Sequence, residues 1–339
     1  MRRNRCSGGR PAYRWGGPTA LALGVLTAGA TAPGAAQGGP SNSGALFLEF
    51  PVGARAVGMG GAAFADGGTG EAAFWNPAGL ATVPAASFEL HTVSLAAGRT
   101  SAVSAHFPSS RIGVFGGAIY LVDYGDLDRT DSSSTTIARI SPRNMEFLAS
   151  FATALPGLLS LGVSYKLVTF QVDCSGDCSG LPNGNGVTHA VDAGVQFAVG
   201  SHDALTVGVA LRNLGFALQI ENRDQADPLP TTLGVGALWQ TALGGADREH
   251  HFDLRVAADV DRPWTGEAPP GIRFGLDVGY RRVARARAGY GVSSGGTASA
   301  SVGLGVASGA IGVDLAQTFL SDSDLESASP TFFSFRVSF

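Results

Sequence analysis

The feature that most constrains this chain is an alternation of apolar and polar residues at period two, which recurs through most of its length. In the segment 271–281, Ile272 and Phe274 share one parity, and Arg273 and Asp277 share the other. Residues at this spacing lie on opposite faces of a β-strand. About fourteen such segments follow one another, most near the ~9–11 residues that a tilted strand needs to cross a bilayer. The pattern predicts an all-β chain.

Alternation alone fits a soluble β-sandwich as well as a membrane barrel. Several features favour the barrel: 49 of 339 residues are Gly, only 15% are charged, and short and long connections alternate along the chain. Bacterial barrels also place aromatic side chains where strands leave the membrane. The aromatic residues expected there are Tyr120, Tyr124, Trp239, Trp264, Tyr280, Tyr290 and Phe319. We therefore predict a transmembrane antiparallel β-barrel of about fourteen strands over 85–339.

The last segment, 331–339, reads TFFSFRVSF. Phe335 and Val337 share one face, and Arg336 lies on the other. We expect this strand to pair with the first one, near 86–95, so that no strand edge is left in lipid. The aromatic Phe339 at the end resembles the assembly signal that the barrel assembly machinery of bacterial outer membranes recognises.

The first 36 residues have the pattern of a cleaved signal peptide. Five arginines precede the apolar stretch 18–32, and the small residues GAA at 34–36 offer a cleavage site. We expect export through this signal peptide, a mature chain that begins near Gln37, and a location in the outer membrane of a Gram-negative bacterium.

Two of the three cysteines, Cys174 and Cys178, stand four residues apart in a polar, Gly-rich stretch. Two thiolates make only half of a zinc site, and no nearby pair of histidines completes one. In an oxidising compartment a small loop disulfide is the better interpretation.

The segment 37–84 does not alternate and is rich in Gly and Ala. Small residues let irregular backbone pack closely inside a lumen, where its polar groups are satisfied away from lipid. We predict that this segment is a hatch, or plug, inside the barrel, with Trp75 as a large anchor beside the Asn76-Pro77 turn signal.

Two stretches resemble a known family. GARAVGMGGAAFADGGTGEAAFWNPAGLA at 53–81 resembles the N-terminal signature of PorV/PorQ-type outer-membrane proteins, which are related to the FadL-like transporters, and 226–239 resembles a loop-to-strand segment of the same family. The resemblance implies a barrel of about fourteen strands with an N-terminal hatch. The residues that it assigns to the hatch are Arg55, Met59, Gly60, Gly61, Trp75, Asn76 and Pro77.

No arrangement of residues indicates an enzyme. Nucleophile-elbow, zinc-protease and phosphate-loop motifs are absent from the sequence, and we expect no catalytic, cofactor or metal site. The net charge of -4 gives no reason to expect nucleic acid as a partner. Acidic residues in the loops are interpreted as solvated side chains. The alternative is that they bind divalent cations.

Charged residues on the inward faces are expected to form a paired polar network, because an unpaired buried charge is costly. The predicted lumen charges are Arg212, Asp253, Arg255, Asp259, Arg273, Asp277, Arg285 and Arg287, together with Asp192 and Asp314.

Three functions stay open at this stage. The family resemblance implies a role in protein export or surface attachment of the type IX secretion kind, with secretion subunits or exported cargo as partners. The alternative is a FadL-like channel for hydrophobic small molecules such as fatty acids, with a lateral gap or kinked strand in its wall. That channel would have an apolar pocket lined by Phe47, Leu48, Phe50, Phe64 and Phe74. The third is a structural barrel in outer-membrane lipid.

Overall fold

The computed structural model describes residues 44–95, 98–156, 159–179, 185–199, 204–218, 226–243, 252–264, 268–320 and 329–339. The predicted signal peptide and the predicted start of the mature chain lie outside these residues. Among the described residues, no helix has the length and apolar character required to cross a membrane.

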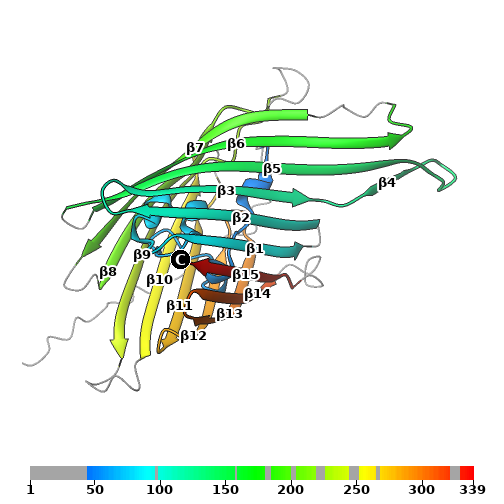
Figure 1. The fold of residues 1–339 in the computed structure, drawn as a ribbon. Coiled ribbons are helices and arrows are strands. Elements are labelled where there is room, and N and C mark those ends of the chain that lie inside the picture. The colour runs from blue at the N-terminus through cyan, green and yellow to red at the C-terminus, as the bar shows by residue number, and fades with distance from the viewer. Residues whose placement is uncertain are drawn as a thin grey trace, which may run out of the picture. The chain divides into compact units, whose positions relative to one another are not determined.

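Antiparallel strands make up the wall. They are β1 (Ser87–Leu95), β2 (Gly98–Ser109), β3 (Gly113–Asp123), β4 (Leu127–Thr130), β5 (Thr136–Leu155), β6 (Leu159–Gly176), β7 (Asn185–Val199), β8 (Leu205–Gly215), β9 (Thr232–Leu243), β10 (Phe252–Pro263), β11 (Gly271–Tyr280), β12 (Ala284–Val292), β13 (Ala298–Ser308), β14 (Ile311–Leu320) and β15 (Thr331–Ser338). Each wall strand pairs with its neighbours in sequence, except that β3 pairs with β5 and leaves β4 outside the ring (Figure 1).

The ring closes where the sequence predicted. Strand β15 pairs with β1 in antiparallel register, with Phe335 opposite Leu90 and Arg336 opposite Glu89. Within the described residues this makes a closed barrel of 14 strands, which confirms the predicted fold class. Closure leaves the wall without a free edge, as backbone in hydrocarbon requires.

The outward face is apolar along most of the wall. Large apolar side chains such as Phe115, Phe274 and Leu304 are exposed there, and in β1 the exposed Phe88 stands between the buried polar residues Ser87 and Glu89. Tyr120 is an exception among the aromatic residues predicted for the membrane interface, because its side chain is only 2% exposed and points into the barrel. It shares parity with Ala118 and Val122, which are also buried, so its position on the strand decided its side.

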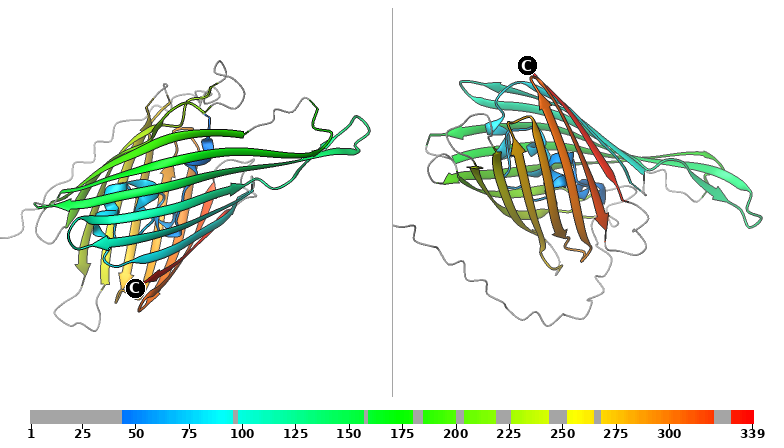
Figure 2. Two further views of the ribbon diagram at one scale, coloured as in Figure 1. Left: turned by 45° about the horizontal axis from the view of Figure 1, so that its top comes forward. Right: turned by 90° about the horizontal axis from the view of Figure 1, so that it is seen from below.

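A ribbon of three strands projects beyond the rest of the wall (Figures 1 and 2). It consists of β4, the first part of β5 and the last part of β6. The pairing between β5 and β6 begins there, with Ala138 opposite Gly176. Cys174 and Cys178 form a disulfide at the tip of β6. The tight turns β2–β3, β11–β12 and β13–β14 lie at the opposite end, together with the C-terminus. We call these two ends the long-loop end and the short-turn end.

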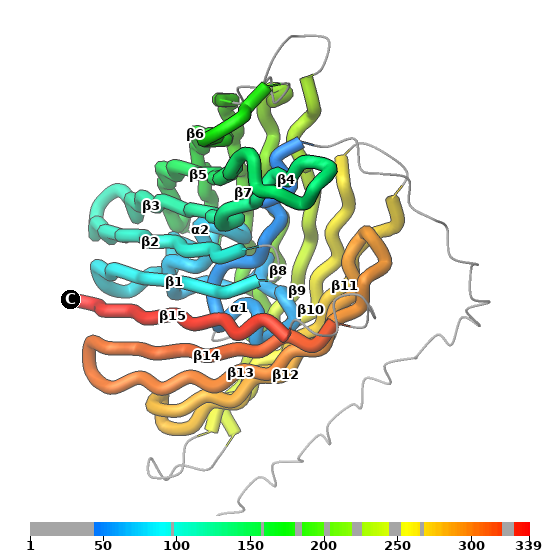
Figure 3. The backbone as a smooth tube through the Cα atoms, turned by 90° about the vertical axis from the view of Figure 1, so that its right-hand side faces the viewer, coloured from blue at the N-terminus to red at the C-terminus, as the bar shows by residue number. Residues whose placement is uncertain are grey.

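Residues 44–86, which we call the plug, lie inside the ring of strands (Figure 3). Short helices interrupt its irregular backbone: η1 (Leu46–Glu49), α1 (Ala54–Gly58), α2 (Ala72–Trp75) and η2 (Pro77–Thr82). Helix α1 packs on β12 to β15, and η2 packs on β5 to β7. Because it contacts walls on both sides, the plug fills the lumen where it passes.

Candidate functional site

Glycines in the wall let the plug backbone approach closely. A Cβ on Gly289 of β12 would lie 2.0 Å from the backbone nitrogen of Gly60. Gly60 itself has a φ of 68°, in the left-handed region that favours glycine. Its N–H donates to Val57 O and to the Ser301 hydroxyl at 3.0 Å. Part of the high glycine content thus serves contact between plug and wall.

Inward-facing side chains satisfy the polar groups of the irregular plug backbone. The Asp259 carboxylate accepts hydrogen bonds from the N–H groups of Ala63 at 2.6 Å and Phe64 at 2.8 Å. The Gln196 amide donates to the carbonyls of Phe64 at 3.1 Å and Asp66 at 2.9 Å. Asn76, within the plug, donates to the same Phe64 carbonyl at 2.6 Å. These bonds replace water as partner for buried backbone groups.

The start of α1 is held by two acceptors. The Ala54 N–H donates to the Ser334 hydroxyl of β15 at 2.8 Å, and the Ala56 N–H donates to the Glu71 carboxylate at 3.0 Å. The last wall strand therefore both closes the ring and binds the plug.

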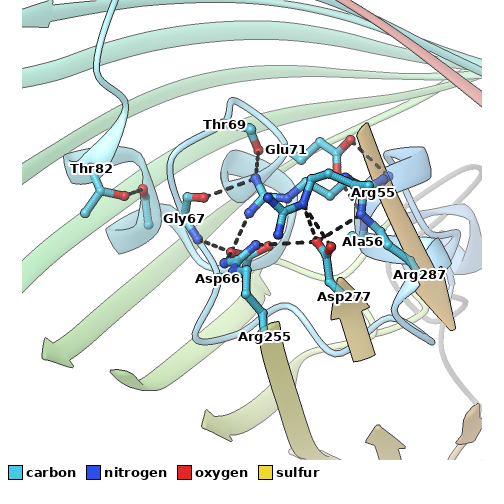
Figure 4. A network of polar contacts seen from close by, with 12 residues as sticks. Arg55, Ala56, Asp66, Gly67, Thr69, Glu71, Thr82, Arg255, Asp277 and Arg287 are labelled. Atoms are coloured by element: carbon cyan, nitrogen blue, oxygen red, sulfur yellow. Dashed lines mark hydrogen bonds and ion pairs between the residues drawn. The ribbon is translucent and has the colours of Figure 1, made fainter. Parts of the chain in front are cut away.

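An ionic network joins plug and wall (Figure 4). Arg55 lies 2.7 Å from Asp66 and donates to Thr69 at 3.1 Å, and Arg255 of β10 pairs with the same Asp66. Burial by itself would raise the pKa of the Asp66 carboxyl. The positive charges of Arg255 and Arg55 have the larger effect and lower the pKa to about 2. Asp66 is thus ionised at neutral pH.

The network continues along the wall. Asp277 of β11 accepts from Arg287 at 3.1 Å (Figure 4). It also accepts from Arg285 at 2.8 Å. Arg285 also pairs with Asp253 at 2.6 Å, and Arg287 pairs with Asp314 at 2.6 Å. Mutual pairing offsets the cost of placing these charges in the lumen.

An aromatic cluster lies between plug and wall on the long-loop side. Phe47 and Phe74 of the plug lie 6.3 and 6.4 Å from the Tyr120 ring of β3, measured between centroids. Leu48 and Trp75 are buried in the same cluster. The Trp75 indole donates to Val52 O at 2.9 Å, so its polar end is satisfied inside the barrel.

A buried lysine lies next to this cluster. Lys166 of β6 is 1% exposed and lies 3.3 Å from Glu146 and 2.8 Å from Asp192. It also donates to Asn213 at 2.8 Å. One cation thus faces two carboxylates in the wall.

Strand β8 bulges at this point. The β7–β8 register shifts between Val191 and Ala193, and Asn213 has a φ of 57°. The Asn213 N–H donates to Asp192 at 2.7 Å. Arg212, the other residue of the bulge, places its guanidinium 5.6 Å from the Trp75 ring. The wall is therefore irregular where it contacts the plug anchor.

The residues predicted to line one apolar pocket lie in two separate parts of the barrel. Phe47, Leu48 and Phe74 are buried in the aromatic cluster, and Phe50 packs against it. Phe64 lies apart, over Gly234 of β9, so grouping it with the other four was wrong. It points to another wall because Asp259 holds its backbone. The cavity beside the cluster has a volume of about 10 Å³, room for about one water molecule.

The predicted lumen charges all lie on inward faces, but their partners differ. Most pair with one another or with the plug, and Arg273 pairs with Asp261. Arg212 instead contacts Trp75 and the Leu48 carbonyl. The predicted hatch residues Arg55, Met59, Gly60, Gly61, Trp75, Asn76 and Pro77 all lie in the plug.

Sequence reasoning missed several inward charges: Glu89, His91, His106, Glu146, Lys166 and Asp261. The alternation contained the signal for Lys166, because Ser160, Ser164 and Lys166 share parity in β6. A single charged residue among small polar ones is a weak indication of a buried charge when one strand is considered without its neighbours.

No family model and no curated protein matches the chain, so the PorV/PorQ resemblance stays a prediction. Several solved structures do match. The toluene transporter TbuX of Ralstonia pickettii has a TM-score of 0.53 and 15% identity, covering 85% of this chain and 98% of that chain. The toluene transporter TodX of P. putida has a TM-score of 0.54 and 13% identity, with 85% and 98% coverage.

The monoaromatic hydrocarbon channel CymD gives similar values: a TM-score of 0.53 and 15% identity, with 85% and 97% coverage. Identities this low establish a shared fold alone. With its closed ring, apolar outer face and internal plug, the described part of the chain is a 14-stranded β-barrel that shares the fold of these solved structures.

Proposed function

We propose that this protein is an outer-membrane channel of the FadL-like type that passes hydrophobic small molecules. The observation that carries the proposal is the aromatic cluster of Phe47, Leu48, Phe74, Trp75 and Tyr120, which lies between plug and wall beside the β8 bulge. Apolar and aromatic side chains with a few placed polar groups are typical of small-molecule sites. The structural neighbours named as toluene and monoaromatic hydrocarbon transporters support this function better than the export hypothesis.

Passage requires movement of the plug. The cavity at the cluster holds about one water molecule, which is too small for an aromatic ring. In bacterial barrels the short turns face the periplasm, so the cluster faces the outer side of the plug. An apolar molecule that enters there has to displace Trp75 or the 47–52 segment. Burial of its apolar surface, at about 25 cal/mol per Å², supplies free energy for that displacement.

A reversible lock on the plug tests this proposal. Ala54→Cys with Ser334→Cys joins α1 to β15, where the Ala54 nitrogen and Ser334 hydroxyl lie 2.8 Å apart. Thr92→Cys with Ser101→Cys is the matched control, because it joins two wall strands whose hydroxyls lie 3.3 Å apart. Uptake of radiolabelled toluene and oleate is measured in a Gram-negative host that has no channel of this kind.

We expect uptake above the empty host for wild type and for the wall control. The plug lock lowers uptake under oxidising conditions, and dithiothreitol restores it. Equal uptake in locked and wild-type cells refutes plug movement. If no form exceeds the empty host for either compound, the channel function itself is wrong. Association with secretion subunits or exported cargo rests on the sequence resemblance alone and predicts that such proteins co-purify with the barrel.

A further inference from the structure

A second cavity, of about 280 Å³, lies at the short-turn end of the lumen. Its walls come from the plug loop 67–69, the β11–β12 turn and strands β10, β12, β13, β14 and β15. Six arginines line it against a single acid, Asp314. They are Arg55, Arg255, Arg282, Arg285, Arg287 and Arg336.

Four of these arginines are already paired, by the network that Figure 4 shows in part. Arg55 and Arg255 share Asp66, while Arg285 and Arg287 share Asp277. The carboxylates of Asp66 and Asp277 do not line the cavity. They offset the charge of the network without occupying the cavity.

The other two arginines, Arg282 and Arg336, form no ion pair with any residue that the structure describes. Glu89 lies opposite Arg336 in the β1–β15 register, but its carboxylate accepts from Gly70 N–H and approaches His91. Arg336 is half-buried, and Arg282 stands on the tight turn at the rim. Both border the same cavity, so two positive charges that form no ion pair with a described residue face it.

We propose that this cavity binds a small organic anion that carries a carboxylate or phosphate group. Guanidinium groups offer planar, paired donors that match the oxygens of either group, and these bonds strengthen where water is partly excluded. A volume near 280 Å³ is at the lower end of small-molecule sites, so it suits a compact anion and not a polymer. The site is distinct from the aromatic cluster, because it lies on the other side of the plug.

Calorimetric titration of the purified full chain in a non-ionic detergent tests the site. The probes are inorganic phosphate and succinate, which separate phosphate from carboxylate recognition. The test variant is Arg282→Gln with Arg336→Gln, since neither side chain forms an ion pair with a residue that the structure describes. The control is Arg262→Gln with Arg281→Gln, which removes the same charge outside the cavity.

We expect wild type and the control to bind at least one probe, and the test variant to bind it at least about tenfold more weakly. A tenfold factor corresponds to about 1.4 kcal/mol, and the loss of one charge-assisted hydrogen bond is sufficient for it. Unchanged unfolding temperatures show that the variants are folded. Absence of binding to both probes, or equal affinity in the test variant, overturns the proposal.

Discussion

Asp259 of the wall and Ala63 of the plug are joined by a hydrogen bond of 2.6 Å, although 196 residues separate them in the sequence. The same carboxylate also accepts from Phe64, so one buried side chain caps two plug N–H groups. This part of the plug lies between α1, which ends at Gly58, and α2, which begins at Ala72. Side chains of the wall therefore help to hold it in position.

Replacing Asp259 by Ala leaves the Ala63 and Phe64 N–H groups without an acceptor. Each unsatisfied buried donor costs about 1–3 kcal/mol, so the two together make local opening easier by about 2–6 kcal/mol. Amide hydrogen exchange at Ala63 and Phe64 measures this directly, with tenfold faster exchange for each 1.4 kcal/mol or so. Asp259→Asn keeps one side-chain acceptor, so its exchange rates are expected to lie between those of wild type and those of Asp259→Ala. Unchanged exchange in the Ala variant would contradict the capping role.

Replacing Gly289 by Val is expected to push the plug away from β12. A Cβ there meets the Gly60 nitrogen at 2.0 Å, a distance that real Cβ atoms essentially never show. Gly295→Val is the control, because the nearest atom to its Cβ is 3.6 Å away. Limited proteolysis of folded protein should cut the plug faster in the first variant only. Equal cleavage of the plug in both variants would show that the backbone at Gly60 can shift to make room for the new side chain.

Asp66 predicts a pH dependence of plug stability. Its pKa in the folded protein is about 2, against 3.8 for the free side chain, because Arg255 and Arg55 outweigh burial. A depressed pKa contributes stability above the unfolded value that is lost as pH falls through the folded value. Wild type should lose on the order of 2 kcal/mol relative to Asp66→Asn between about pH 5 and pH 2.

Urea unfolding followed by fluorescence at each pH gives this difference. Because Asn does not titrate, its curve isolates the contribution of Asp66 from that of other acids. A constant difference across the range would mean that the Arg pairs do not stabilise the ionised form.

Removing the charge of Lys166 by Lys166→Met leaves Glu146 and Asp192 buried without a cation. Breaking a buried ion pair on one side costs about 3–5 kcal/mol. Adding Glu146→Gln is expected to recover part of the loss, because one of the two carboxylates is then neutral. Thermal unfolding of the two variants beside wild type measures both steps. Full stability of Lys166→Met would refute mutual compensation in this cluster.

Deleting Phe339 tests the predicted assembly signal separately from stability. Its side chain is 73% exposed, and its backbone N–H donates to Ala86 O at 2.8 Å. We expect less barrel in the outer membrane but nearly the same unfolding temperature for the purified protein. Phe339→Tyr should behave as wild type. An equal amount of barrel after deletion would contradict the signal.

The fold class could be predicted because a barrel wall repeats one simple rule. Alternation places Phe335 outside and Ser334 inside whatever strand lies beside them, and closure then requires β15 to meet β1. The inward side of Asp259 and Arg287 follows from parity in the same way. Tyr120 was misassigned because aromatic character was weighed above its parity with Ala118 and Val122.

The sequence by itself thus determined a barrel of alternating strands and the small-residue segment that fills it, because period and composition are local properties. Only the tertiary structure decided that Phe64 leaves the aromatic cluster, that Lys166 sits between Glu146 and Asp192, and that Arg282 meets Arg336 at one cavity. Each of these depends on strand register and on the path of the plug across the lumen. Those are set by contacts between residues far apart in the chain, such as Asp259 with Ala63, which no local pattern encodes.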